Sequence, residues 1–136
     1  MDNYNVLVLM EKDPITSEFL DTVLSVRMEE GLENVSKAYV SEESGEFYAF
    51  LYLTTPDVED WEFYGIFEDY EGLGGMLEEY DDYNPAWILK LPYGKDDNEN
   101  EDMIRNAVKL HYKEYQRLKA SIPAKRSDYE AMASEE

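Results

Sequence analysis

The residues best suited to chemistry lie in one segment, residues 57–83. This stretch holds eleven carboxylates and seven aromatic rings, and it contains no lysine or arginine. Such a composition could serve as a hard-cation site, a pair of acid–base carboxylates, a surface that imitates nucleic acid, or an ordinary solvated helix. The rest of the chain ranks these four possibilities.

Patterns for metal binding and catalysis are weak throughout the chain. An EF-hand alignment started at Asp96 fails, because Glu101 stands where the loop requires glycine. The chain has no cysteine, and its single histidine, His111, falls on an apolar helical stripe where packed histidines are common. With 32 acidic residues, pairs of carboxylates arise by chance. We therefore expect no enzyme, no cofactor and no metal, with a weak hard-cation site at Asp81 and Asp82 as the alternative.

Charge is distributed unevenly along the 136 residues, whose formal net charge is −20. Residues 1–83 contain 3 Lys and Arg against 22 Asp and Glu, whereas residues 84–136 contain 9 against 10. A field this negative repels nucleic acid and anionic membrane surfaces. The sequence has no apolar stretch of bilayer length and no secretion signal. We expect a cytoplasmic protein with basic partners and no direct contact with nucleic acid or membranes.

The elements that must position these residues follow from the hydrophobic periodicity. Strands are expected at residues 4–10, 34–41, 46–54 and 86–93, and the second and third are joined as a hairpin at Gly45. Helices are expected at residues 16–30, 56–71 and 104–122, with Thr55 and Pro56 at the start of the second and acidic residues before the third. Residues 73–84 are expected to form an irregular, acidic connection. The first and third strands are apolar on both faces and belong inside a sheet, whereas Lys90 and Pro92 suit the fourth to an edge. For residues 16–30 a strand is the alternative, because every second residue from Thr22 to Met28 fits one face.

The resulting order of elements predicts an α+β fold. It is that of a ferredoxin-like βαββαβ antiparallel sheet with an additional C-terminal helix, and the alternative is a β-meander followed by helices. Residues 1–122 would form a single domain. Pro123 and the polar residues after it indicate a disordered tail over residues 123–136.

The helix at 56–71 has two distinct faces. One face is apolar, and an offset face combines a tryptophan and a tyrosine with four carboxylates. Large aromatic residues within a polar rim are common at protein interfaces, so we predict a partner-binding surface here. Together with acidic residues that follow the helix, its members are Asp57, Asp60, Trp61, Tyr64, Glu68, Glu71, Glu78, Glu79, Asp81 and Asp82.

These acidic rows have the spacing of a polyanion. Carboxylates three or four positions apart on a helix lie about 5–6 Å from each other, which approximates the charge density of duplex phosphates. In size, acidity and lack of cysteine the chain resembles small acidic inhibitors made by phages and mobile elements, including DNA mimics and some anti-CRISPR proteins. This resemblance implies an inhibitor that occludes a nucleic-acid-binding surface of a basic protein, and it carries over no individual residues. The predicted function is non-enzymatic binding of a basic or nucleic-acid-binding protein.

A function of another class is the alternative: a small structural or adaptor module that homodimerises through its sheet face or its C-terminal helix. That helix carries basic residues four positions apart beside its apolar stripe. Such a row is either solvated or docked on an acidic surface of this chain or of a second copy. The residues of this self-association surface are Arg105, Lys109, Lys113, Tyr115, Arg117 and Leu118.

Overall fold

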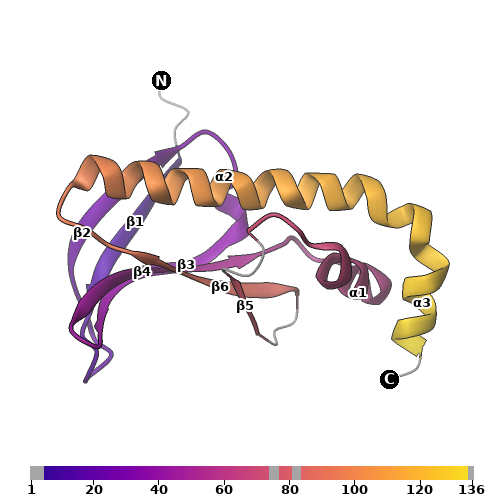
Figure 1. Cartoon of the computed structure of the whole chain (residues 1–136), viewed down its shortest axis with the longest axis horizontal. Coiled ribbons are helices and arrows are strands. Elements are labelled where there is room, and N and C mark those ends of the chain that lie inside the picture. The colour runs from indigo at the N-terminus through magenta and orange to yellow at the C-terminus, as the bar shows by residue number, and fades with distance from the viewer. Residues whose placement is uncertain (1–4, 74–76, 81–83, 135–136) are drawn as a thin grey trace.

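Six strands form one mixed sheet within residues 5–73, 77–80 and 84–134, the part of the chain that the computed structural model describes. The strands are β1 Asn5–Lys12, β2 Phe19–Met28, β3 Val35–Glu43, β4 Glu46–Thr54, β5 Leu77–Tyr80 and β6 Ala86–Pro92. Their order is β2-β1-β3-β4-β6-β5, with β1 and β3 parallel and the other neighbours antiparallel. The helical elements are η1 Leu32–Asn34, α1 Asp60–Asp69, α2 Asp97–Ser121, η3 Ile122–Lys125 and α3 Arg126–Ser134. α2 lies across one face of the sheet, and α1 and α3 lie beyond one end of it (Figure 1).

The predicted α+β class and the long C-terminal helix are confirmed, but the ferredoxin-like order is not. A ferredoxin-like fold needs a helix between its first two strands, and residues 16–30 contain β2 instead. The sheet is closer to the alternative, a meander, with α1 inserted between β4 and β5.

β2 shows why the helix prediction for residues 16–30 was wrong. Every second residue from Leu24 to Met28 is buried and the residues between them are exposed, as expected for a strand with one covered face. Phe19 and Leu20 completed the apparent helical spacing, yet they are 48% and 42% exposed. The strand exists because β1 offers an antiparallel partner, which local periodicity does not reveal.

The β3–β4 hairpin matches its prediction. Ser44 and Gly45 have positive φ angles of 55° and 85°, the two-residue turn that fits the twist of paired strands. In β4, Ala49, Leu51 and Leu53 are fully buried, and the strand lies inside the sheet.

β6 is not the edge strand that Lys90 and Pro92 indicated, because it lies between β4 and β5. β5 pairs only with Ala86 to Leu89, so the two residues lie past the end of that pairing. β5 itself occupies part of the acidic segment for which an irregular connection was expected.

α2 has the predicted apolar stripe and the predicted acidic start. Asp96 caps the helix by accepting hydrogen bonds from the backbone N–H groups of Asn98 and Glu99. Val108 and Leu118 of the stripe are fully buried in the core that α2 shares with the sheet.

Residues 123–134 form η3 and α3 in place of the expected disordered tail. Both elements pack against α1, and the side chain of Tyr129 is only 3% exposed. One large ring among polar neighbours gives too weak a pattern for sequence-based prediction, because its packing site lies on a distant helix.

Candidate functional site

α1 begins with acidic residues that stabilise its first turn. The backbone N–H of Glu59 donates to the Glu62 carboxylate at 2.9 Å, and Asp60 and Glu62 are favoured by the helix dipole. The helix does not begin at the predicted Thr55–Pro56 pair. Thr55 is buried, and its hydroxyl donates to the Pro56 carbonyl.

Trp61 belongs to the core, which corrects its predicted place outside the packed face of α1. Its side chain is 9% exposed, and its indole N–H donates to Glu59 Oε2 at 2.7 Å. The Arg126 guanidinium lies 4.7 Å from the centre of the indole ring and 3.8 Å from the same carboxylate oxygen. A ring, a carboxylate and a cation therefore meet here, and the cation comes from the chain's own C-terminal segment.

A second contact joins the far end of α1 to the same segment. Asp69 Oδ2 accepts a 2.6 Å hydrogen bond from the Tyr129 hydroxyl and lies 3.4 Å from Lys125 Nζ. Burial and the Asp69 carboxylate raise the pKa of Tyr129 to about 12, so the hydroxyl keeps the proton that it donates. A Cβ at Gly65 would stand 2.8 Å and 2.9 Å from two carbons of the Tyr129 ring. The missing side chain at Gly65 is what lets α3 dock.

We expect Gly65→Ala to detach α3 from α1. Alanine favours a helix over glycine by about 1 kcal/mol, but here its Cβ meets a rigid ring, and overpacking typically costs about 1–3 kcal/mol. The free energy of unfolding should fall, and trypsin should cleave faster at Lys125 and Arg126. In a Tyr129→Ala background the same change should stabilise the protein. Equal effects in both backgrounds would contradict this docking geometry.

Exposed carboxylates of the predicted surface lie on or beside α1. They are Asp57, Asp60, Glu68 and Glu71. Tyr64 is half-buried, and Glu78 and Glu79 are exposed on β5. Asp81 and Asp82 lie outside the described residues, as does the cation site considered there. Among the residues that the structure does describe, no group of three or more His, Asp and Glu could hold a metal ion.

A buried polar network joins α1 to α2 and β4. The His111 side chain is fully buried, with Nε2 2.8 Å from the Thr54 carbonyl oxygen and Nδ1 2.9 Å from the Tyr70 hydroxyl. A carbonyl oxygen only accepts, so Nε2 carries the proton and Nδ1 accepts from Tyr70. Burial lowers the pKa of His111, although the Thr54 carbonyl and Glu114 oppose that shift. The imidazole is a packed core residue, as its place on the apolar stripe predicted.

Glu114 fastens the C-terminal end of α1 to α2. Its carboxylate accepts from Arg117 Nε and Nη2 at 2.8 Å and 2.7 Å and from the Glu71 backbone N–H at 2.5 Å. Burial raises the pKa of Glu114, but these hydrogen bonds outweigh it and leave the pKa below its ordinary value. Arg117 also donates to the Asp69 backbone carbonyl at 2.8 Å, where the helix leaves carbonyl groups unpaired.

Most of the predicted self-association residues make contacts within the chain. The two apolar residues of this set, Tyr115 and Leu118, are buried in the core, so neither is exposed to a second copy. Arg105 bonds Glu101, Asp102 and a β2 carbonyl, and Arg117 bonds α1 and α2. The remaining two, Lys109 and Lys113, are exposed. Contact between the basic residues of α2 and acidic groups of the same chain was one of the arrangements that the sequence left open.

Comparison with known families covers nearly the whole chain. A family described as being of unknown function, DUF6762, matches residues 1–130. The chain belongs to this family. Neither the curated proteins nor the solved structures yield a match. No helix in the described ranges is long and apolar enough to cross a membrane.

The sequence-based prediction missed the residues that complete this site, Lys125, Arg126 and Tyr129, because they fell in the segment interpreted as a tail. A weak signal was present. The segment after Lys125 is rich in residues that favour helices, and Tyr129 and Met132 stand three positions apart on it.

Proposed function

We propose that this protein is a non-enzymatic binding protein whose acidic α1 surface engages a basic segment of a protein partner. The α1 surface comprises Trp61, Asp69 and the exposed carboxylates Asp57, Asp60, Glu68 and Glu71. A nucleic-acid-binding protein has the required charge, and covering its basic surface would make this chain an inhibitor.

The proposal rests on one observation: this surface already holds cationic and phenolic groups from its own chain. Arg126 stacks on Trp61, and Lys125 and Tyr129 meet at Asp69. Arginine over an indole ring and a phenol on a carboxylate are contacts on which protein interfaces rely. The surface thus has the chemistry to hold a partner segment that carries arginine and tyrosine.

The resident segment is suited to displacement. α3 has nine residues, fewer than the roughly 12–15 at which an isolated helix becomes stable, so it depends on its contacts with α1. Residues 122–134 carry Lys125 and Arg126 against Asp128 and Glu130, so their formal charges cancel. A partner segment with a net positive charge would be attracted more strongly by the surrounding carboxylates.

The test uses the full chain with a photo-crosslinking residue at position 57, in the cells that produce the protein. We expect an adduct with a basic protein, and we expect Asp60→Lys/Glu68→Lys to reduce its yield by about tenfold or more. These two changes lie at opposite ends of α1, so their effects on the helix dipole largely cancel.

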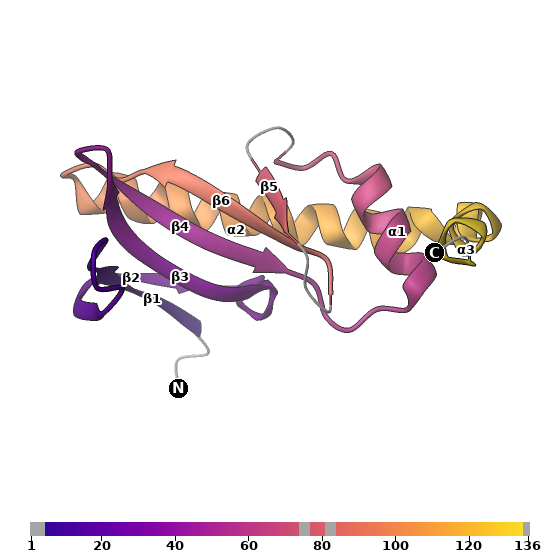
Figure 2. The same cartoon turned by 90° about the horizontal axis from the view of Figure 1, so that it is seen from below.

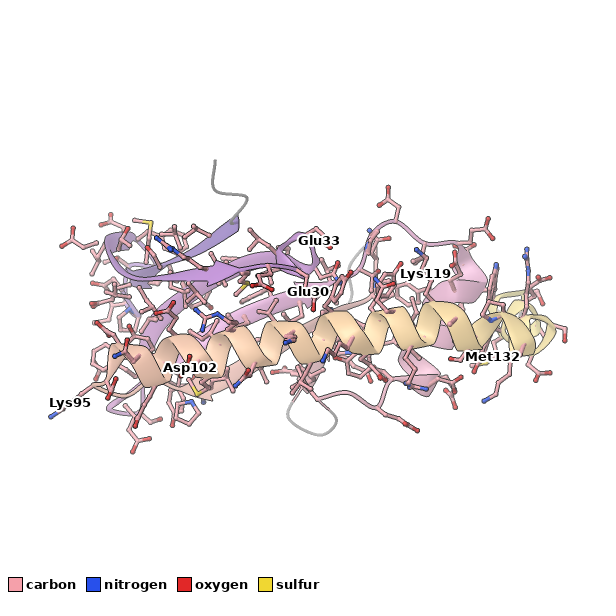
Figure 3. The ribbon with its side chains drawn as sticks, turned by 90° about the horizontal axis from the view of Figure 1, so that it is seen from above. Glu30, Glu33, Lys95, Asp102, Lys119 and Met132 are labelled. Atoms are coloured by element: carbon pink, nitrogen blue, oxygen red, sulfur yellow. The ribbon has the colours of Figure 1, made fainter. Side chains whose placement is uncertain are left out.

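The matched control is Glu29→Lys/Glu30→Lys, which changes the net charge equally at two exposed residues directly after β2. Glu30 lies away from α1 (Figure 3). This control variant should leave the adduct intact. Raising the salt concentration from about 0.05 M to about 0.5 M should weaken association, because the added ions screen the charges and shorten the distance over which they attract. An adduct that both double variants reduce equally, or that salt does not affect, would refute the proposal.

A further inference from the structure

The six-stranded sheet has helices on one face only, in the part of the chain that the structure describes. α2 lies behind the sheet when the molecule is seen from below (Figure 2). The strand register places the residues of the uncovered face in continuous rows across neighbouring strands. We call this the open sheet face; it comprises Val6, Val8, Met10, Lys12, Phe19, Thr22, Ser25, Arg27, Lys37, Tyr39, Ser41, Glu43, Glu46, Tyr48, Phe50, Tyr52, Ile88, Lys90 and Pro92.

The open sheet face exposes apolar surface. Val6, Val8 and Phe19 are 45%, 47% and 48% exposed at its β2–β1 side. Beside them, the rings of the half-buried Phe50 and of Tyr39 stack with their centres 5.1 Å apart. Tyr39 itself is 7% exposed, because side chains of its own chain, Lys12 and Lys37 among them, lie over its ring. A contiguous apolar and aromatic patch on an otherwise charged protein indicates an interaction surface.

This face also differs in charge from the rest of the molecule. Lys12 and Lys37 lie over the Tyr39 ring at 4.6 Å and 5.4 Å, and Lys90 lies over Tyr48 at 4.1 Å. With a net charge of −20 on each copy, two molecules repel each other across their acidic surfaces. On the open sheet face Lys and Arg outnumber Glu, so the repulsion between the acidic surfaces of two copies is weakest across this face.

The charges along β3 are self-complementary. Lys37 and Glu43 project from the same face of the strand, six residues or about 20 Å apart. Glu43 Oε1 accepts from Lys90 Nζ of the same chain at 2.9 Å, and the half-exposed carboxylate keeps its second oxygen for a further cation. A two-fold axis that lies in the interface, perpendicular to β3 and opposite Val40, reverses the strand direction of the second copy. It therefore places Lys37 of each copy opposite Glu43 of the other, while the aromatic rows meet at the centre.

The face has an area of the same order as that of a stable contact. Five strands spaced about 4.8 Å apart, with about eight residues each, span roughly 20 × 26 Å, or about 500 Å² in projection. Side-chain relief increases the accessible area above this value. A standard interface removes about 800 Å² from each partner, which is of the same order.

We infer that two copies of this chain associate face to face through their open sheet faces, about this two-fold axis. The second copy covers the exposed valines and phenylalanine and pairs its Glu43 with Lys37. Single-stranded nucleic acid could also stack on such rings, but the net charge of the protein opposes it. The inference is independent of the α1 surface, which lies beyond the end of the sheet (Figure 2).

The test is sedimentation velocity on the full chain with a charge swap. At micromolar concentration we expect twice the 15.9 kDa chain mass, or 31.8 kDa. Lys37→Glu and Glu43→Lys should each raise the dissociation constant about tenfold or more, and the double variant should restore it to within about threefold. Both side chains are exposed, so both variants should fold, which circular dichroism checks.

Matched controls place the same charge changes elsewhere: Lys119→Glu on α2 and Glu33→Lys on η1, both exposed (Figure 3). They should leave the dimer intact. A wild-type monomer at high micromolar concentration, or a charge swap that fails to restore association, would overturn the inference. It would also be overturned by tight binding of a fluorescent oligo-dT that Lys37→Glu abolishes, because the face would then be a nucleic-acid site.

Discussion

Trp87→Ala is expected to lower the free energy of unfolding by about 3–5 kcal/mol. The indole is 2% exposed and joins three elements, with ring centres 5.2 Å from Phe67, 4.7 Å from Tyr70 and 5.2 Å from His111. Its loss leaves an indole-sized cavity where β6, α1 and α2 meet. Urea unfolding followed by far-ultraviolet circular dichroism measures the effect without relying on tryptophan fluorescence.

The matched control is the same change at the other tryptophan. Trp61 is 9% exposed, and one side of its ring is covered by the Arg126 side chain, which can move into the space left by the ring. Trp61→Ala should therefore cost clearly less than Trp87→Ala. If Trp61→Ala lowers the free energy of unfolding as much as Trp87→Ala or more, the packing described for Trp87 is wrong.

His111→Leu is expected to lower the free energy of unfolding by about 2–4 kcal/mol near neutral pH. The substitution leaves the Thr54 carbonyl and the Tyr70 hydroxyl buried without their partner, at about 1–3 kcal/mol for each unsatisfied group. An increase in stability would show that the apolar replacement fills the site better than the imidazole, and would contradict the network.

The same residue makes the wild-type protein sensitive to acid. Burial lowers the pKa of His111 in the folded state below the ordinary value of 6.5, so the unfolded chain takes up the proton more readily. The stabilisation is complete above pH 6.5 and is lost as the pH falls below it. Unfolding curves measured from neutral pH to below pH 6.5 should show a falling free energy of unfolding in the wild type. Variants without the imidazole should not show this contribution to the pH dependence.

His111→Gln is the control that separates packing from titration. Its amide nitrogen can approximate Nε2 and keep the hydrogen bond to Thr54, but it does not titrate. We expect a smaller loss of stability than for leucine, with the same loss of pH dependence between neutral pH and the carboxylate range. A pH profile like that of the wild type would assign the acid sensitivity to other groups.

The two proposed surfaces are compatible with one another. α1 lies beyond the end of the sheet, so a dimer formed through the open sheet faces would leave both α1 surfaces accessible (Figure 2). Such a dimer would bind a repetitive or dimeric partner through two sites, and its avidity would exceed the affinity of either site.

Local pattern was sufficient for several elements. The C-terminal helix was predicted because its apolar residues recur at helical spacing over many turns, although α2 begins at Asp97, seven residues before the predicted start. The β3–β4 hairpin was predicted correctly because a glycine turn separates two strand-like runs. The acidic character of the surface around α1 follows directly from composition.

Contacts between distant segments decided the rest. β2 is a strand because β1 pairs with it, and the isolated segment fits helical and strand periods about equally. Trp61 is buried because Arg126 covers it, and Asp69 is paired because Tyr129, sixty residues later, reaches it. Periodicity reports only which faces of an element can be buried. What covers each face depends on chain segments brought together by folding. The sequence by itself therefore determined the charge and the elements with a strong local pattern, such as α2, β3 and β4. Only the tertiary structure decided that residues 19–28 form a strand, that α3 docks on α1, and which groups meet in the site.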